Sequence, residues 1–546
     1  MLSAVQKRAV SARPSPRQLA WQRLGLTMFV HFSVNTFTDR EWGEGTEPES
    51  VFAPSALDPR QWARVAAECG FKLLILTCKH HDGFCLWPSK FTSHTVAALP
   101  GGRDVVGETA AACREYGIGF GVYLSPWDRH EKSYGDSPRY NRFFLNQLGE
   151  LLSNYGKISS VWFDGACAEG ADGRHQEYDW EAYYALIRKL QPEAVISGCA
   201  PDVRWCGNEA GKRRRAEWSV VNLDRSWHDF NQQCCVLEDL GSLEQLGECE
   251  NPVWYPSEVD TSIRPGWFYH RDEDDRVKSL AELVDIYFNS AGHNAVLLLN
   301  VPPDQRGLFH ETDVARLREF HDYLERAFSE NLLPGNRGEL AFDFGTEREF
   351  NCLELAEDVV NHGQRVEEYH LEIESPAGEA RIICRGATIG IRELSRFPLV
   401  RARRGRVVID SSRGEAPLLR VGLFRIPELA VPAAAEAAPP TREWSVPPGL
   451  PAEFVLDLGE ERMVNGVLVI PPAGRFGHIF KYEICAGIDA DACRRCVAGE
   501  FGNTPNNPQP CRVIFAEPVR ARFLRLRALS TVDGGPEARI GGFEAI

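Results

Sequence analysis

Short apolar runs alternate with helical patterns between residues 24 and 330, and this alternation restricts the fold more than any other feature of the chain. We expect eight of these runs to form buried parallel strands. They are Leu26–Phe32, Leu73–Cys78, Gly119–Leu124, Ile158–Phe163, Ala194–Ser197, Trp218–Val221, Trp254–Glu258 and Ala295–Asn300. Eight strands with helices between most of them predict an α/β fold, the (β/α)8 or TIM-like barrel.

The first intervening helix shows how clearly the pattern can be read. Asp58 and Pro59 supply an N-cap and a proline at the first turn. Apolar residues follow at i, i+3, i+4 and i+7, and Gly70 is expected to end the helix.

The pattern changes after Pro334 to period-two strands separated by turns. An internal repeat occurs here, because Asp343-Phe344-Gly345 and the residues that follow match Asp457-Leu458-Gly459, displaced by 114 positions. A spacing of this size indicates a duplicated domain. We therefore expect a catalytic barrel over residues 1–333 and β-sandwiches over 334–430 and 444–546, with a Pro/Ala-rich linker at 431–443.

The net charge argues against some classes of ligand, and the cysteine content bears on the cellular compartment in which we expect the protein. The formal net charge of −16 argues against nucleic acid as the ligand, and no apolar run is long enough to span a membrane. Most of the 16 cysteines stand singly in apolar segments, and the first 20 residues lack the apolar core of a signal peptide. We expect a cytoplasmic protein, or an exported one if a leader has been removed. The sequence does not indicate the oligomeric state.

Polar residues follow the predicted barrel strands at their carboxyl ends, where barrel enzymes place their active sites. They are His31, His80, His81, Tyr123 and Asp164. Asp164 ends an apolar strand and precedes glycine, so we expect its carboxylate at the barrel mouth with room for a ligand. The alternative is that Asp164 caps the next helix.

The adjacent histidines raise the question of a metal site. Neighbouring residues on an extended strand point to opposite faces, so we expect that His80 and His81 do not chelate one ion together. Three histidines at two neighbouring strand ends favour a polar pocket instead. We expect neither a metal nor a cofactor.

Two carboxylates lie beside tryptophans in the sequence. Glu41 precedes Trp42, and Trp205 lies four residues before Glu209. A carboxylate next to an indole can hold a pyranose, with the hydroxyls on the acid and the C–H face on the ring. This arrangement suggests a carbohydrate ligand.

Several sequence blocks in this order resemble the α-L-fucosidases of glycoside hydrolase family 29, over about residues 20–330. The blocks are Met28–Phe32, Glu41-Trp42, Lys79–Phe84, Val161–Gly165, Trp205–Glu209, Glu217–Val220, Ser262–Trp267 and Leu298–Pro303. The carboxy-terminal copies resemble galactose-binding (discoidin-like) β-sandwiches, through segments such as Phe454–Gly459 and Val519–Leu526. A carbohydrate-binding role of these domains and a purely supporting role are both open.

The resemblance implies a retaining exo-hydrolase that removes terminal L-fucose from fucosylated oligosaccharides or glycoconjugates. Asp164 matches the family nucleophile. Glu209 matches the acid/base position of the subgroup specific for α-1,3/1,4-linked branches of Lewis type, and Glu217 is the competing candidate. The expected fucose-binding residues are His31, Glu41, Trp42, His80, His81, Tyr123 and Trp205, with Glu258 as a further candidate. The alternatives are a linkage-promiscuous fucosidase, a related barrel glycosidase for another sugar, and a non-catalytic fucose-binding protein.

Overall fold

The computed structural model describes residues 9–170, 173–198, 201–214, 216–224, 226, 240–374, 378–429, 444–445, 448–502 and 504–546. The chain divides into two units. Unit 1 consists of Met1–Val34, Glu44–Ile263 and Val277–Ala430, and unit 2 of Asn35–Gly43, Arg264–Arg276 and Val431–Ile546. The predicted linker at 431–443 lies outside the described residues.

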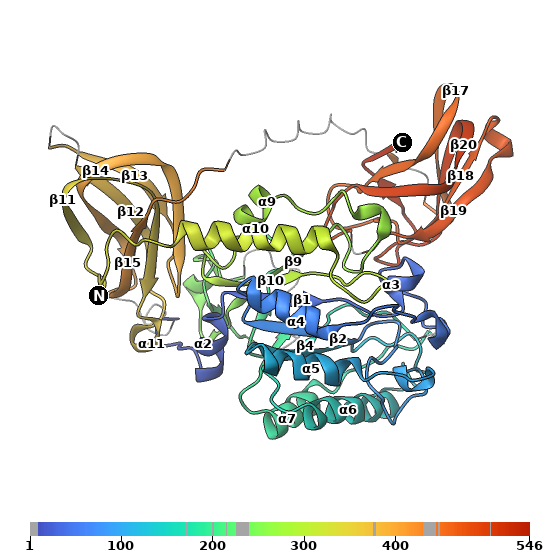
Figure 1. Cartoon of the computed structure of the whole chain (residues 1–546), viewed down its shortest axis with the longest axis horizontal. Helices are drawn as coiled ribbons and strands as arrows, with labels where there is room; N and C mark the ends of the chain where they lie inside the picture. The colour runs from blue at the N-terminus through green and yellow to red at the C-terminus, as the bar shows by residue number, and fades with distance from the viewer. Residues whose placement is uncertain are drawn as a thin grey trace. The chain divides into compact units, whose positions relative to one another are not determined.

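Unit 1 contains an eight-stranded parallel sheet flanked by helices, which confirms the predicted barrel-like architecture (Figure 1). The sheet order is β5-β4-β3-β2-β1-β10-β9-β6. The strands are β1 (Leu26–Val30), β2 (Leu73–Lys79), β3 (Gly119–Leu124), β4 (Ser160–Phe163), β5 (Val195–Gly198), β6 (Arg204–Trp205), β9 (Ser257–Ser262) and β10 (Ala295–Asn300). The helices of this part are α2 (Pro16–Gln22), α4 (Pro59–Glu68), α5 (Val105–Glu115), α6 (Ser137–Asn154), α7 (Trp180–Leu190), α9 (Leu280–Phe288) and α10 (Glu311–Ala327).

The first helix after β1 in the barrel pattern forms as its sequence predicts. Helix α4 begins at Pro59, and the carboxylate of Asp58 accepts the backbone N–H of Arg60 at 3.0 Å. Gly70 follows the helix with a φ of +84°, a conformation that favours glycine. The local capping chemistry therefore sets both ends of this helix.

The sixth barrel strand is β6, which the apolar runs do not reveal. Its two residues pair in parallel with Ser257 and Glu258 of β9. On the other side, the backbone N–H of Val203 donates to the carbonyl of Ile196 in β5 at 3.2 Å, which brings the two ends of the sheet together. A two-residue strand is too short to produce a periodic apolar pattern.

Two predicted barrel strands are wrong. The run Trp218–Val221 contributes to β7 (Val220–Asn222), which pairs antiparallel with β8 (Pro252–Trp254) in a separate two-stranded sheet. The predicted strand Trp254–Glu258 is interrupted, because β8 ends at Trp254 and β9 starts at Ser257. Pro256 lies in the break and has no N–H to donate to a ladder.

Both carboxy-terminal β domains contain a five-stranded antiparallel sheet with the same strand order. The first, in unit 1, has the order β13-β12-β14-β11-β15, and the second, in unit 2, has the order β19-β18-β20-β17-β22. The first comprises β11 (Ala341–Glu357), β12 (Val366–Glu374), β13 (Ala380–Gly386), β14 (Glu393–Ser412) and β15 (Leu418–Phe424), with α11 (Val359–His362) after β11. The second comprises β17 (Ala452–Ile470), β18 (Lys481–Gly487), β19 (Arg494–Glu500), β20 (Cys511–Ala528) and β22 (Gly542–Ala545). Unit 2 also contains α3 (Asn35–Thr38) and the strand pair β16 (Trp444–Ser445) and β21 (Arg539–Ile540).

The repeated Asp-x-Gly sequence has the same structure in both copies. Asp343 accepts the backbone N–H of Gly345 at 2.8 Å, and Asp457 accepts that of Gly459 at 2.9 Å. Both glycines have positive φ, and both segments lie where the pairing with the neighbouring long strand shifts register. This equivalence supports a duplicated domain.

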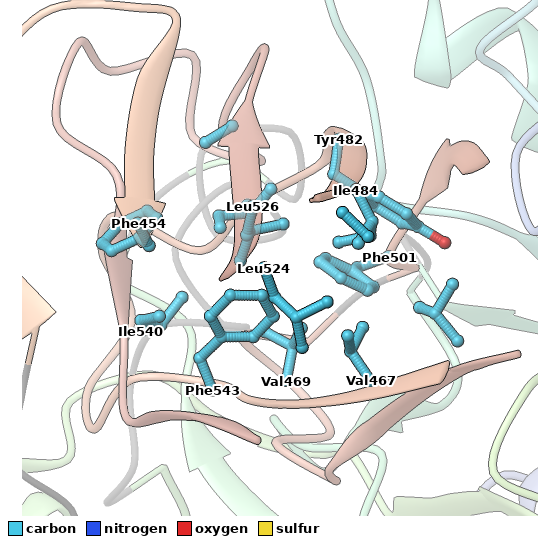
Figure 2. Close-up of a cluster of buried hydrophobic side chains, with 14 of the residues drawn as sticks. Phe454, Val467, Val469, Tyr482, Ile484, Phe501, Leu524, Leu526, Ile540 and Phe543 are labelled. Atoms are coloured by element: carbon cyan, nitrogen blue, oxygen red, sulfur yellow. The ribbon is translucent and has the colours of Figure 1, made fainter. Parts of the chain in front are cut away.

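The sheet of unit 2 has its own buried core. Figure 2 shows apolar side chains from several strands meeting in this core. The labelled residues are Phe454, Val467, Val469, Tyr482, Ile484, Phe501, Leu524, Leu526, Ile540 and Phe543. None of the helices in the described part of the chain is both long enough and apolar enough to cross a membrane.

Candidate active site

Four neighbouring strands of the barrel sheet carry polar side chains at their carboxyl ends. His31 follows β1, His80 and His81 follow β2, Tyr123 lies near the end of β3, and Asp164 follows β4. The ring of His80 lies 5.6 Å from the rings of both His31 and Tyr123, measured between centroids. The structure thus brings together five of the residues expected from the sequence.

Asp164 receives two hydrogen bonds at this site. The hydroxyl of Tyr123 donates to its Oδ2 at 2.9 Å, and the backbone N–H of Ala166 donates to its Oδ1 at 2.7 Å. Burial raises the pKa of Asp164, while these two donors act in the opposite direction. About a quarter of the side chain (24%) is still exposed, so the carboxylate is both oriented and accessible.

The hydrogen bonds around His81 determine which of its ring nitrogens carries the proton. The hydroxyl of Ser125 donates to the carbonyl of Trp127 at 2.6 Å, so its oxygen accepts from Nδ1 of His81 at 2.7 Å. Burial lowers the pKa of His81 well below its ordinary value, and the nearby Arg129 charge acts in the same direction. A neutral ring with the proton on Nδ1 leaves Nε2 as an acceptor, 3.9 Å from Oδ2 of Asp164.

His31 is oriented in a similar way from the far side of β1. The Nδ2 amide of Asn300, the last residue of β10, donates to the hydroxyl of Ser262 at 2.9 Å. The Oδ1 of Asn300 therefore accepts from Nδ1 of His31 at 2.8 Å. These contacts fix the ring plane of His31.

His80 and His81 lie side by side, and the expectation that they point to opposite faces is wrong. Strand β2 ends at Lys79, so the alternation of an extended strand does not continue through the pair. Their ring centroids are 4.1 Å apart. Among the described residues, His80, His81 and Asp164 are the one group of three potential metal ligands, with ligand atoms within 4.8 Å of one another.

Two tryptophan–carboxylate pairs lie between β4, β6 and β9. Nε1 of Trp162 donates to Oε1 of Glu258, and Nε1 of Trp205 donates to Oδ1 of Asp260, both at 2.7 Å. Burial raises the pKa of Glu258 to about 7. Burial also raises the pKa of Asp260 well above its usual range, and the negative charge of Glu209 adds to this effect. Glu209 therefore lies within electrostatic reach of the Trp205–Asp260 pair.

Glu209 and Glu217 have different surroundings although they are eight residues apart. Glu217 is fully buried and forms an ion pair with the equally buried guanidinium of Arg204. The backbone N–H of Arg214 donates to its other oxygen at 3.2 Å. Glu209 follows β6 in a loop and is 9% exposed. Both oxygens of Glu217 are therefore engaged in the protein interior, away from any position from which they could protonate a glycosidic oxygen.

Glu41 and Trp42 belong to unit 2 of the chain. The carboxylate of Glu41 accepts the backbone N–H of Trp267 at 3.0 Å and that of Phe268 at 3.2 Å, and contacts Nε2 of His270 at 2.6 Å. The ring of Trp42 packs on Phe480 with 4.8 Å between centroids. Their positions are set by the carboxy-terminal sheet and the segment 264–276.

Three residues beyond those expected from the sequence orient the site residues. Asp260 holds Trp205, Asn300 holds His31, and Ser125 holds His81. Asn300 is the last residue of β10, so the rule that selected Asp164 could have selected it, whereas Asp260 lies two residues before the end of β9.

Comparisons with known proteins agree with this geometry. The family described as Alpha-L-fucosidase matches residues 10–327. "Alpha-L-fucosidase 1" of Arabidopsis thaliana is 40% identical over 454 residues, covering 75% of this chain and 87% of the relative. A glycoside hydrolase 29 family member from a rumen bacterium has 36% identity and a TM-score of 0.70, covering 98% of this chain and 99% of the other. A Ruminococcus gnavus GH29 fucosidase in complex with fucose has 30% identity and a TM-score of 0.68, covering 76% and 95%.

The matched region spans the barrel and all the strand-end residues described above. The chain belongs to the α-L-fucosidases of glycoside hydrolase family 29, a family of retaining enzymes.

Proposed function

We propose that this α-L-fucosidase hydrolyses terminal α-1,3- and α-1,4-linked L-fucose on branched, Lewis-type glycans by double displacement. The observation that carries the proposal is the buried ion pair between Glu217 and Arg204. It disfavours Glu217 as the proton donor and supports Glu209, which matches the acid/base position of the α-1,3/1,4 subgroup in the sequence resemblance.

In the first step, the ionised Asp164 attacks the anomeric carbon of fucose and forms a glycosyl ester. The hydrogen bonds from Tyr123 and Ala166 orient the carboxylate of Asp164 and stabilise its ionised form. The protonated Glu209 gives its proton to the departing glycosidic oxygen, and the remaining glycan leaves as an alcohol.

In the second step, Glu209 is ionised and accepts a proton from water as that water attacks the anomeric carbon. The bond to Asp164 breaks, and fucose leaves with its original configuration. Glu209 needs a raised pKa to donate at neutral pH.

The fucose hydroxyls are proposed to contact His31, His80, His81 and Glu41. With Nδ1 of His81 and of His31 donating to Ser125 and Asn300, Nε2 of each ring is proposed to accept a hydrogen bond from a sugar hydroxyl. Trp42, Tyr123 and Trp205 are proposed as aromatic surfaces for the C–H face and the methyl group of fucose. Glu258, whose Oε1 accepts from Nε1 of Trp162, is proposed as a further fucose-binding residue.

The linkage proposal is tested by fucose release from three substrates at equal concentration. They are a Lewis-type trisaccharide, an α-1,2-linked fucosyl-lactose and a nitrophenyl fucoside. Release from the trisaccharide without release from the α-1,2 sugar is expected. Comparable kcat/KM on both natural sugars would make the enzyme linkage-promiscuous, and no release from any would leave a fucose-binding protein.

We also propose carbohydrate binding by the last domain, within the domain boundaries expected from the sequence: 1–333 for the catalytic part, 334–430 and 444–546 for galactose-binding-type sandwiches, and 431–443 for the linker. Phe476 supports this role, because it is 73% exposed in the turn between β17 and β18 and next to Arg475. An exposed ring beside a hydrogen-bond donor suits a galactoside. Galactose titration of the full chain with Phe476→Ala tests it, and unchanged binding would contradict it.

A further inference from the structure

We propose that Glu500, in the carboxy-terminal domain, is a positioning residue for fucose binding. Its carboxylate holds the backbone of the segment 35–43, which carries Glu41 and Trp42. This inference rests on the proposed function, in which Glu41 and Trp42 contact the sugar. It gives the carboxy-terminal domain a positioning role through the segment 35–43, which belongs to the same unit.

The chain connectivity links this segment to the barrel. Strand β1 ends at Val30, the chain enters unit 2 at Asn35, and it returns to unit 1 at Glu44. A second segment, Arg264–Arg276, enters unit 2 after β9 in the same way. Both excursions begin at the carboxyl ends of barrel strands, from which active-site loops arise in this fold.

Glu500 binds the first segment through three consecutive amides. Its Oε1 accepts the backbone N–H of Glu41 at 3.0 Å, of Trp42 at 2.8 Å and of Gly43 at 3.2 Å. Consecutive amides that converge in this way form a concave anion-binding nest, and the φ of +69° at Gly43 is typical of one. The Glu500 side chain is 0% exposed, so these charge-assisted hydrogen bonds are shielded from water.

The Glu41 side chain is held as firmly as its backbone. A Cβ added to Gly502, two residues after Glu500, would lie 3.0 Å from Cγ of Glu41, so the absence of a side chain there leaves room for it. Burial disfavours the charged form of His270, but its hydrogen bonds to Asp39 and Glu41 raise its pKa well above normal. Glu41 therefore faces an imidazolium ring.

The Glu41 carboxylate still has capacity for a sugar hydroxyl. Oε1 accepts from Phe268 and His270, and Oε2 accepts from Trp267. An ionised carboxylate offers about four acceptor positions, so one position on Oε2 remains. The direction in which this lone pair of Oε2 points depends on the backbone conformation of Glu41, which the hydrogen bonds to Glu500 fix.

Trp42 depends on the same domain through its ring. Phe480 packs against it with an interplanar angle of 44°. Loss of the Glu500 hydrogen bonds would release the backbone of both binding residues, and a binding site that is about 1 Å too loose because its supporting contacts are missing functions poorly. The reacting carboxylate is on another strand, so the effect should fall mainly on KM.

The test compares Glu500→Ala and Glu500→Gln with the matched control Glu517→Gln, which changes an exposed acid on β20 of the same sheet. The measurements on the full chain are kcat and KM for nitrophenyl fucoside, the inhibition constant of free fucose, and the thermal unfolding midpoint. We expect Glu500→Ala to raise KM and the fucose inhibition constant about 10-fold, with kcat changed less than about threefold. Glu500→Gln, whose amide oxygen still accepts, should have a smaller effect, and the control none.

A double-mutant cycle separates positioning from structural support. In a Trp42→Ala background, Glu500→Ala should raise KM much less than it does alone, because both changes act on one segment. A wild-type KM in folded Glu500→Ala, while Trp42→Ala raises KM, would overturn the inference and leave the proposed fucose subsite intact. Unchanged KM in both Glu41→Gln and Trp42→Ala would overturn the subsite and the inference with it. If Glu500→Ala does not fold, the KM of Glu500→Gln is compared with that of the wild type instead, and an unchanged KM there, while Trp42→Ala raises KM, overturns the inference.

Discussion

The Tyr123 hydroxyl lies 2.9 Å from Oδ2 of Asp164 and joins the end of β3 to the carboxylate that follows β4. This hydrogen bond opposes the effect of burial, which raises the pKa of Asp164. Removing the hydroxyl should therefore raise that pKa further. The ionised, reactive form of Asp164 would then be lost at a higher pH than in the wild type.

We predict that Tyr123→Phe moves the acidic limb of the pH profile of kcat/KM upward, by about one pH unit. Tyr140→Phe is the matched control, because the Tyr140 hydroxyl donates to the carbonyl of Pro126 and not to a carboxylate. An acidic limb that stays in place in Tyr123→Phe would show that this hydrogen bond does not control Asp164.

Glu209→Gln and Glu217→Gln should fail in different ways. Glu209→Gln removes the proposed proton donor, so kcat on the natural glycan should fall by about 10²- to 10⁴-fold with little change in thermal stability. Glu217→Gln leaves the buried guanidinium of Arg204 without its counter-charge, which typically costs about 3–5 kcal/mol of unfolding free energy. Kinetics normalised to folded protein, with thermal melts, distinguish the two. Wild-type stability with lost turnover in Glu217→Gln would reverse the assignment.

Burial of Glu258 predicts a pH-dependent stability. Its pKa rises from 4.5 to about 7 in the folded protein, so the folded state binds the proton more tightly than the unfolded chain. Stability should therefore decrease as pH rises from about 4.5 to about 7, and the loss should persist above that range.

Glu258→Gln should remove this loss, which amounts to at most ~3 kcal/mol. The amide oxygen can still accept from Trp162. The thermal midpoint of Glu258→Gln should thus exceed that of the wild type at pH 8 and match it more closely at pH 4. Glu347→Gln, at an exposed position, is the control. Equal gains at both pH values would contradict the account.

Gly198, at the end of β5, borders the backbone that leads to Asp164. Its φ is +78°, and an added Cβ would lie 1.9 Å from the carbonyl oxygen of Phe163. Gly198→Ala should displace β4 at its carboxyl end and lower both stability and kcat. Gly149→Ala in helix α6 is the control, where nothing lies within 4 Å and a gain of about 0.5–1 kcal/mol is expected. Wild-type kinetics in Gly198→Ala would show that this close approach has no role.

The barrel strands that carry site residues are readable in the sequence, because they are apolar runs that end in polar residues. His31, His80, His81, Tyr123 and Asp164 are found by that rule. Strand β6 is not, since Arg204 and Trp205 form a two-residue strand that depends on pairing with β9. Pairing between distant segments leaves no local periodicity.

The contacts between side chains that are distant in the chain could not be predicted from the sequence. Arg204 and Glu217 are 13 residues apart and meet only in the folded interior, so the choice between Glu209 and Glu217 could not be made from spacing. The contact between Glu500 and Glu41 spans 459 positions. The position of His80 beside His81 depends on where β2 stops, which a periodic pattern locates only approximately.

The central claim is that Asp164 attacks the sugar and Glu209 exchanges the proton. The most direct test is the configuration of the fucosyl azide formed from nitrophenyl α-L-fucoside by Asp164→Gly and by Glu209→Ala in the presence of azide, read by NMR. We predict the β-azide from Asp164→Gly, because azide replaces the nucleophile in one displacement, and the α-azide from Glu209→Ala, because azide attacks the glycosyl ester. An α-azide from Asp164→Gly, or α-azide from Glu217→Ala and none from Glu209→Ala, would contradict the account.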